Sequence, residues 1–426
     1  MRKKIAIFLM LILILLFFTG CYDSKEIDDY AYITLMGIDK GVSDRIRLTL
    51  QVPEFSKASG EGGGSDGGQN EEEKIDKENF TVDATSVLSA IANVNANIPK
   101  ILNFMHLKAI VVSEDMAKSG ELGEIVAPLV RYRQIRRNVN VIICKGKAQE
   151  FVKSARPYLG GLVTETLEDL IERSRYTGFY TDVSIGHLSD EIKSTYSQLL
   201  AIYGAINKGE NFVEDGPLYE GGYKIPSDFY AGDVPRKGGQ EIELLGTAVF
   251  DGDRMVGTLT GFEAQMLHLV WGDLRRSVFT IPDPEEPEQV IPLEIKEFEK
   301  PIIKVDTKTD KPHIEVKLSM EGDITAIPSR INYEHYMKKR TIEDVFEKYL
   351  EEGIQRTFKK GQSLKVDVFQ FGTQAVRNFW TIPEWEEYNW LEKITQATLS
   401  VEVDFTVRRT GKLTESQPIR STEGEE

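Results

Sequence analysis

The chain contains 426 residues, of which 41% are hydrophobic and 28% charged, and this composition is ordinary for a globular protein. Its length is sufficient for two or three domains with hydrophobic cores. The formal net charge of −16 at pH 7 argues against nucleic acid as a partner and against broad electrostatic adhesion to anionic lipid.

The first 20 residues have the pattern of a lipoprotein signal peptide. Basic residues at 2–4 precede an uncharged apolar run at 5–18, which suits a signal h-region and is short for a membrane span. Small residues at 19–20 directly precede Cys21, as at lipoprotein cleavage sites, although Phe18 stands where such sites usually carry leucine. We therefore expect cleavage before Cys21 and diacylglycerol on its thiol, with an uncleaved N-terminal anchor as the alternative.

The second cysteine of the chain is Cys144. If Cys21 is acylated, no intramolecular disulfide can form, and the fold depends on its apolar cores. Cys144 ends an apolar run at 139–144 with the pattern of a buried strand, so we expect it to be packed and unreactive. No second apolar run approaches the length of a membrane span, so the rest of the chain is expected to lie in water beside the membrane.

The predicted N-terminal domain covers residues 21–195. Strands are expected at 30–38 and 45–52. The segment 57–77 is rich in Gly, Ser, Asp and Glu and cannot bury enough apolar surface to offset its ordering entropy, so it is predicted to be a flexible loop. Glycines at 62–67 match a nucleotide-binding spacing, but acidic neighbours and the lack of a following helix argue against phosphate binding.

The remainder of this domain alternates helices with short buried strands. Apolar residues recur at helical spacing in several segments. The helices are expected at 87–94, 122–130, 148–155 and 164–175, and the strands at 107–112 and 139–144. This order favours parallel strand pairing within an α/β layer.

A small middle domain is predicted for residues 196–275. A strand at 201–206 is followed by a Gly- and Pro-rich passage and then by a hairpin across 244–259. The hairpin turn is Asp251-Gly252, a sequence that favours a tight two-residue turn. The segment 263–270 is expected to be a helix that packs over this hairpin.

Residues 276–295 are predicted to be an acidic, proline-rich linker, because prolines interrupt a run of carboxylates there. A C-terminal α/β domain is expected at 296–415, followed by a disordered tail at 416–426. The domain is expected to contain strands at 314–320, 364–368 and 399–407, a helix from a Thr341 cap to Gly361, and a helix at 383–394. The whole pattern predicts a mixed α/β fold of three domains, each a β-sheet packed with helices.

The chain lacks the sequence patterns of catalytic or metal sites. Five histidines are scattered without an HExxH pattern or a pair at metal-ligand spacing, and neither a P-loop nor a GxSxG motif is present. We therefore predict no enzymatic activity, no metal and no cofactor. Trp380, Trp385 and Trp390 recur every five residues and are expected either to pack the C-terminal domain or to line an interaction surface.

Several short motifs occur in a fixed order along the chain. Directly after Cys21 stands Tyr-Asp-Ser-Lys-Glu-Ile at 22–27, followed by Gly-Ile-Asp at 37–39. Further motifs lie at 106–112, 131–136, 246–250, 257–259, 367–372 and 408–411. Together they resemble the Ger(x)C family, the C subunits of spore germinant receptors, with Tyr22 in place of the family's tryptophan and Gln370 in place of a glycine.

The resemblance implies a three-domain lipoprotein, held by the diacylglycerol on Cys21 at the outer face of the inner membrane of a bacterial endospore. It implies assembly with an A subunit and a transporter-like B subunit, and a role in initiating germination through protein contacts without enzymatic activity. Arg131, Arg133, Arg136 and Arg137 form a candidate contact surface for such partners, the alternative being a solvated helix end.

A different function is a lipid-anchored solute-binding protein that serves a transporter. Proteins of that class usually have two similar α/β lobes with a ligand cleft between them. The three dissimilar units predicted from this sequence disfavour that class.

Overall fold

The computed structural model of the protein describes residues 4–5, 26–53, 77–156, 163–216, 224–413, 415–421 and 424–425. Nearly all of the predicted signal peptide, Cys21, and the predicted flexible loop at 57–77 except its last residue lie outside the described residues. Within the described part of the chain, no helix has the length and apolar character needed to cross a membrane.

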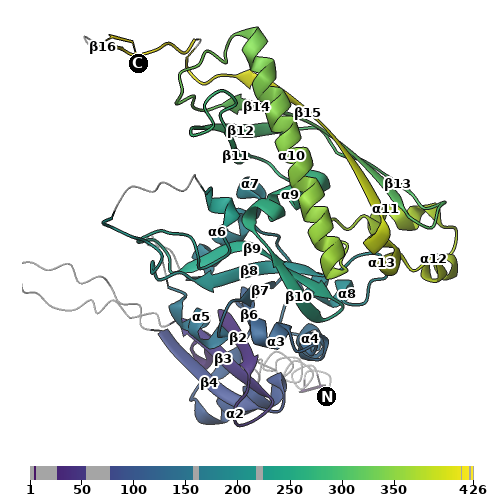
Figure 1. The fold of residues 1–426 in the computed structure, drawn as a ribbon. Helices are drawn as coiled ribbons and strands as arrows, with labels where there is room; N and C mark the ends of the chain where they lie inside the picture. The colour runs from purple at the N-terminus through teal and green to yellow at the C-terminus, as the bar shows by residue number, and fades with distance from the viewer. Residues whose placement is uncertain are drawn as a thin grey trace, which may run out of the picture.

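Eight strands form one sheet in the order β10-β9-β8-β7-β6-β2-β3-β4 (Figure 1). The strands are β2 Leu35–Lys40, β3 Ile46–Pro53, β4 Lys77–Ala84, β6 Ala109–Ser113, β7 Asn140–Cys144, β8 Leu200–Ile206, β9 Ile242–Asp251 and β10 Arg254–Leu259. The central strands β2, β6, β7 and β8 pair in parallel, and the strands at both ends pair antiparallel. The predicted parallel pairing is therefore confirmed, whereas β4 was not predicted.

Helices cover both faces of this sheet. The helices are α2 Val87–Asn97, α3 Glu114–Ala117, α4 Leu122–Arg131, α5 Ala148–Ser154, α6 Val163–Glu172, α7 Ser174–Thr177 and α8 Ile185–Glu191. One face packs against α5 and α6, and the other packs against α2, α3, α4 and α8. Burial on both faces explains why β6 and β7 are continuous apolar runs rather than alternating ones.

A short parallel pair lies beside the large sheet. It joins β1 Tyr30–Tyr32 to β5 Ile101–Asn103, with Tyr30 opposite Ile101. A three-residue 3-10 helix, η1 Ile27–Asp29, leads into β1. This pair therefore connects the N-terminal end of the described chain to the segment that follows α2.

The separate middle domain predicted at 196–275 is wrong. Its strands β8, β9 and β10 belong to the same sheet as the N-terminal strands, because β8 pairs in parallel with β7. Without β8, the backbone groups along one side of β7 would be buried without partners. The predicted hairpin is confirmed, and Gly252 adopts a positive φ of 60° in its turn.

Helix α9, Gly261–Trp271, lies between the two large sheets. Thr260 and Glu263 form a reciprocal capping box at its start. Nearly every residue of α9 is buried, and its side chains join β9 and β10 of the first sheet to the core of the C-terminal sheet. The helix therefore connects the two halves of the molecule rather than covering a small domain.

The C-terminal sheet contains five strands. They are β11 Ser277–Pro282, β12 Val290–Phe298, β13 Ile302–Asp306, β14 His313–Ile324 and β15 Thr398–Arg409. β14 pairs antiparallel with β12 and β13 and parallel with β15. The alternation predicted for 314–320 is confirmed, since Ile314, Val316, Leu318 and Met320 are buried.

The linker predicted at 276–295 is wrong, because β11 and most of β12 form an antiparallel hairpin there. Phe279, Ile281, Ile291 and Leu293 are buried in the core of the C-terminal sheet. Pro284, Pro287 and the carboxylates at 283–288 occupy the turn between the two strands, whereas Pro282 and Pro292 lie within the strands. In this turn Asp283 accepts hydrogen bonds from Ser329 and Tyr333, each at 2.6 Å.

The long helix α10, Tyr336–Leu364, crosses the C-terminal sheet (Figure 1). Its N-cap is His335 rather than the predicted Thr341, which lies inside the helix. The strand predicted at 364–368 is wrong, because the chain turns there through Lys365, with a positive φ of 59°, and buries Val366 and Val368.

The chain between α10 and β15 consists of short helices. They are α11 Gly372–Ala375, η3 Val376–Asn378, α12 Ile382–Tyr388, α13 Trp390–Lys393 and η4 Ile394–Gln396. The single helix predicted at 383–394 is therefore broken, and the break is Asn389 with a φ of 52°.

The predicted disordered tail at 416–426 is in part ordered. Ser416 donates a hydrogen bond to Glu334 at 2.7 Å, and β16 Arg420–Ser421 pairs with β17 Gly424–Glu425. Together, the two sheets and their helices confirm the predicted mixed α/β class, while the predicted division into three domains is replaced by two sheets joined through α9.

Candidate functional site

The histidines lie apart from one another in the fold. His268 is buried on α9, where its ring nitrogens contact Asp273 Oδ1 at 2.8 Å and the Tyr180 carbonyl oxygen at 2.9 Å. It therefore holds α9 against the segment that precedes α8. Among the described residues, no group of three or more His, Cys, Asp or Glu side chains could hold a metal ion.

Cys144 is buried in β7 as the sequence predicted. Burial raises the pKa of its thiol well above the ordinary value, because the thiolate would lose its hydration. A buried neutral thiol is a poor nucleophile. Cys144 therefore contributes to core packing and is not a candidate nucleophile.

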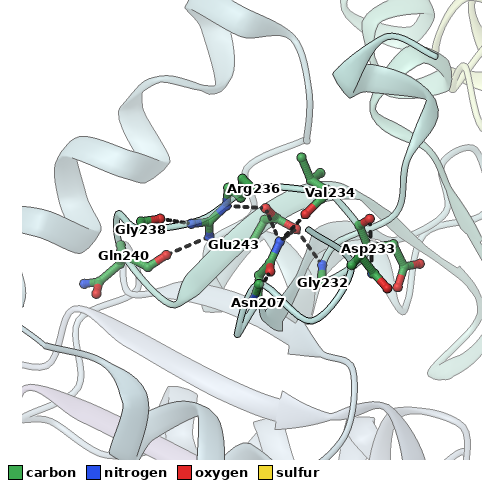
Figure 2. Close-up of polar contacts among 10 residues, drawn as sticks. Asn207, Gly232, Asp233, Val234, Arg236, Gly238, Gln240 and Glu243 are labelled. Carbon is green, nitrogen blue, oxygen red and sulfur yellow. Dashed lines mark hydrogen bonds and ion pairs between the residues drawn. The ribbon is translucent and has the colours of Figure 1, made fainter. Parts of the chain in front are cut away.

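An open pocket of ≈ 490 Å³ lies between α6 and the start of β9. Two of its lining residues, Arg236 and Glu243, belong to a dense hydrogen-bond network (Figure 2). Glu243 accepts from Arg236 Nε at 2.8 Å, from the Gly232 backbone N–H at 2.7 Å and from Asn207 Nδ2 at 3.1 Å.

Arg236, like Glu243, forms several hydrogen bonds within this network. Its remaining nitrogens donate to the carbonyl oxygens of Gly238 at 2.8 Å and Gln240 at 2.7 Å (Figure 2). The ion pair with Glu243 therefore fixes the loop 232–240 against β8 and β9. Because Arg236 and Glu243 direct their hydrogen bonds to groups within this network, they stabilise the fold rather than bind a ligand in the pocket.

The four arginines predicted as a contact surface do not share one environment. Arg137 contacts α8, where it donates to Asp190 Oδ2 at 2.9 Å and to the Gly186 carbonyl oxygen at 3.3 Å. Arg131, at the end of α4, and Arg133 and Arg136 in the following loop are exposed, and none of them forms an ion pair with the described residues. The structure therefore separates Arg137 from the other three.

The loop that carries these arginines packs beside the segment after β5. The Phe104 backbone N–H donates to Gln134 Oε1 at 3.2 Å, and the rings of Phe104 and Tyr132 meet edge to face at 5.7 Å. On the other side of the same segment, the His106 ring lies 4.8 Å from the Tyr32 ring of β1. The arginine loop, the 101–106 segment and β1 are therefore adjacent.

The motif at 367–372 forms the junction between the two sheets. The Asp367 backbone N–H donates to Gln198 Oε1 at 2.8 Å, and Trp271 Nε1 donates to the Phe369 carbonyl oxygen at 3.0 Å. A β-carbon added at Gly372 would meet the carbonyl oxygen of Tyr196, so the two backbones are in close contact. The sequence motif itself is distinctive, but no local pattern distinguishes its partner Gln198.

The three tryptophans divide between packing and surface. Trp385 and Trp390 are buried and lie 6.1 Å apart with stacked rings, and Trp385 Nε1 donates to Thr195 Oγ1 at 3.0 Å. Trp380 is 96% exposed, and Ile382, two residues later, is exposed as well. Two of them therefore pack the domain, and one is available to a partner.

Comparisons with known proteins agree with this architecture. The N-terminal domain of spore germination proteins matches residues 23–204, and the C-terminal domain described as spore germination B3/GerAC-like matches residues 245–411. The boundary between them falls between β8 and β9, which are neighbours in one sheet. The two family segments are therefore joined by strand pairing rather than by a linker alone.

Curated relatives from Bacillus subtilis (strain 168) cover most of the chain. Spore germination protein KC is 23% identical, covering 96% of this chain and 97% of its own, and spore germination protein B3 is 25% identical, covering 84% and 85%. The crystal structure of the GerBC protein shares the fold, with a TM-score of 0.51 and 17% identity over 87% of this chain and 96% of that one. The chain therefore belongs to the GerAC-like family of spore germination proteins, the Ger(x)C family that its motifs resemble.

Proposed function

We propose that the protein is the C subunit of a spore germinant receptor and initiates germination through contacts with an A subunit and a transporter-like B subunit. The observation that carries the proposal is the match of both family domains, in order, across the two sheets.

The proposed location is the outer face of the inner membrane of the spore, with diacylglycerol on Cys21 as the anchor. The signal-like pattern before Cys21 supports it. A short lipid tether would keep the protein beside membrane subunits and raise its effective concentration there.

Co-purification tests the proposal. Tagged protein would be isolated from detergent-solubilised spore inner membrane, and its partners identified by mass spectrometry. We expect an A-type and a transporter-like B-type subunit with the wild-type protein, and their loss with Cys21→Ala. Cys144→Ala is the matched control, because it removes the other thiol and leaves the anchor intact.

Recovery of a transporter permease with its ATPase would instead indicate a solute-binding protein. The two large sheets in the described part of the chain, one of eight strands and one of five, do not form the pair of similar lobes that such proteins usually have. Full nutrient-triggered germination with a soluble Cys21→Ala protein would contradict the anchoring part of the proposal.

A further inference from the structure

Two stretches of this acidic chain contain no aspartate or glutamate, although these residues make up 68 of its 426 positions. The stretches are 84–113 and 125–149. They pack against each other through α2 and α4 and through the contacts of Phe104 with Gln134 and Tyr132. Carboxylates are therefore excluded from one connected region of the first sheet's surface helices and loops.

Five exposed cations of these stretches have no carboxylate partner within the described residues. Lys108 pairs with Glu168, Arg137 with Asp190 and Lys145 with Asp233, so their charges are balanced. Of the other five, Lys147 caps α5 on the opposite face of the sheet, and Lys100, Arg131, Arg133 and Arg136 lie on the side of α2 and α4. The result is a local positive surface on a protein whose net charge is −16.

Apolar side chains are exposed within the same surface. Ile101 is 42% exposed and Met105 is 45% exposed, and they lie on either side of the buried residues Leu102 and Phe104. Exposed aliphatic side chains interleaved with unpaired cations are typical of protein surfaces that lie in the headgroup region of a bilayer.

The predicted anchor is close to this surface. Ile101 of β5 lies opposite Tyr30 of β1, and β1 follows η1 directly. The five residues from Cys21 to Glu26 span at most ~17 Å when fully extended. A body tethered so closely cannot turn every face away from the bilayer. The part of the body nearest the tether is the separate β1–β5 pair, which lies beside the first sheet.

We infer that Lys100, Ile101, Met105, Arg131, Arg133 and Arg136, here called the basic face, dock on a bilayer that carries anionic headgroups. The inference rests on the proposed lipid anchor at Cys21. Charge complementarity selects lipid of negative charge, and the exposed Ile101 and Met105 supply the apolar contact. Docking would fix the orientation of the tethered body relative to membrane partners.

Each basic side chain near an anionic surface strengthens binding by roughly fivefold. The short tether also brings Glu26, Asp28 and Asp29 towards the bilayer, and their charge opposes docking. The basic face is therefore expected to orient a protein that the lipid already holds, rather than to bind membrane strongly without it.

The test uses the full lipidated protein on vesicles, with a fluorescent label on Met105→Cys and a bilayer-embedded quencher. Cys21 is acylated in this protein and Cys144 is buried, so the introduced thiol is the reactive one. We expect strong quenching on vesicles of 70% phosphatidylcholine and 30% phosphatidylglycerol, which salt weakens, and little quenching on pure phosphatidylcholine. A label on Tyr336→Cys, on the C-terminal helix α10, should remain unquenched.

The combined variant Arg131→Gln, Arg133→Gln and Arg136→Gln should abolish quenching at position 105 while the protein stays on the vesicles. The matched control replaces three exposed lysines of the C-terminal half, Lys304, Lys308 and Lys359, by glutamine and should leave quenching unchanged.

Vesicle-bound protein whose position 105 remains unquenched would overturn the inference, as would equal quenching on both lipid compositions. Loss of a co-purified subunit in the triple arginine variant, with quenching unchanged, would assign the basic face to a protein partner instead and also overturn it. Failure of the protein to associate with any vesicle is a different result, because it would contradict the lipid anchor.

Discussion

The indole Nε1 of Trp390 donates a hydrogen bond to Asp367 Oδ2 at 2.8 Å, and the same oxygen accepts the Gly372 backbone N–H at 2.8 Å. The carboxylate therefore holds the turn that follows α10 in the shape that contacts Gln198 of the first sheet. Burial raises the pKa of Asp367 to about 6, because the charged form loses its hydration despite these donors.

This pKa predicts a specific pH dependence of stability. The folded-state pKa lies above the unfolded value of 3.8, so the contribution of Asp367 to stability is complete below about pH 4 and is lost as the pH rises through about 6. The loss amounts to on the order of 3 kcal/mol. Asp367→Asn stays neutral and still offers an oxygen to both donors, so it should lack this loss.

The measurement is the free energy of unfolding in denaturant for both proteins between pH 4 and pH 7.5. We expect the difference between variant and wild type to move in favour of Asp367→Asn by about 2–3 kcal/mol over that range. A difference that does not change with pH would show that Asp367 does not titrate in the folded protein there.

The close approach at Gly372 predicts a steric effect at the same junction. An alanine β-carbon would meet the Tyr196 carbonyl oxygen and lie 2.7 Å from Trp390 Nε1. Gly372→Ala should therefore lower the free energy of unfolding by roughly 1–3 kcal/mol. Gly216→Ala is the control, because its β-carbon would have Val213 Cγ1 at 3.9 Å as its nearest neighbour. Equal stability of the two variants would contradict the close approach.

Local patterns predicted most helices and strands of this chain because each depends on neighbouring residues. The hydrophobic spacing at 122–130 and the Asp251-Gly252 turn both led to the observed elements, α4 and the β9–β10 hairpin. The pairing of β7 with β8 could not be predicted in this way, because some 55 residues separate Cys144 from Leu200. That pairing decides that the first two predicted domains share one sheet.

The linker prediction failed because local composition does not show which residues of a segment are buried. Pro282 and the acidic residues after it suggested a linker, yet the flanking Ile281 and Ile291 are fully buried in adjacent strands. In the candidate site, the arginines were found from their local density, but the partner of Arg137 on α8 was not, since Asp190 is distant in sequence. The exposed apolar residues beside them could be identified only after burial of each position was known.

The edge of β15 provides a third prediction. Glu343, Glu347 and Glu351, one helical turn apart on α10, accept the backbone N–H groups of Val407, Phe405 and Val403 at 2.9, 3.1 and 3.2 Å. These carboxylates replace the next strand of the sheet and protect an otherwise open edge.

Glu347→Ala removes one of these acceptors and should cost about 1–2 kcal/mol in the free energy of unfolding, because the Phe405 N–H is left without its partner. Glu347→Gln keeps an acceptor oxygen and should cost less. Glu352→Ala, on the exposed side of α10, is the control. If Glu347→Ala and Glu352→Ala were equally stable, the carboxylates would not be protecting the edge.

The different environments of Trp380 and Trp385 allow packing and partner binding to be separated. Trp385 is 2% exposed and contacts Phe379, Tyr388 and Trp390, so Trp385→Ala should lower the free energy of unfolding by about 3–5 kcal/mol. Trp380 projects from the surface, so Trp380→Ala should change stability by less than about 0.5 kcal/mol.

If the exposed tryptophan serves a receptor partner, Trp380→Ala should reduce recovery of the A-type or B-type subunit in the co-purification without loss of folded protein. Unchanged recovery of both subunits would remove Trp380 from the contact surface, and a large loss of stability would contradict its exposed position.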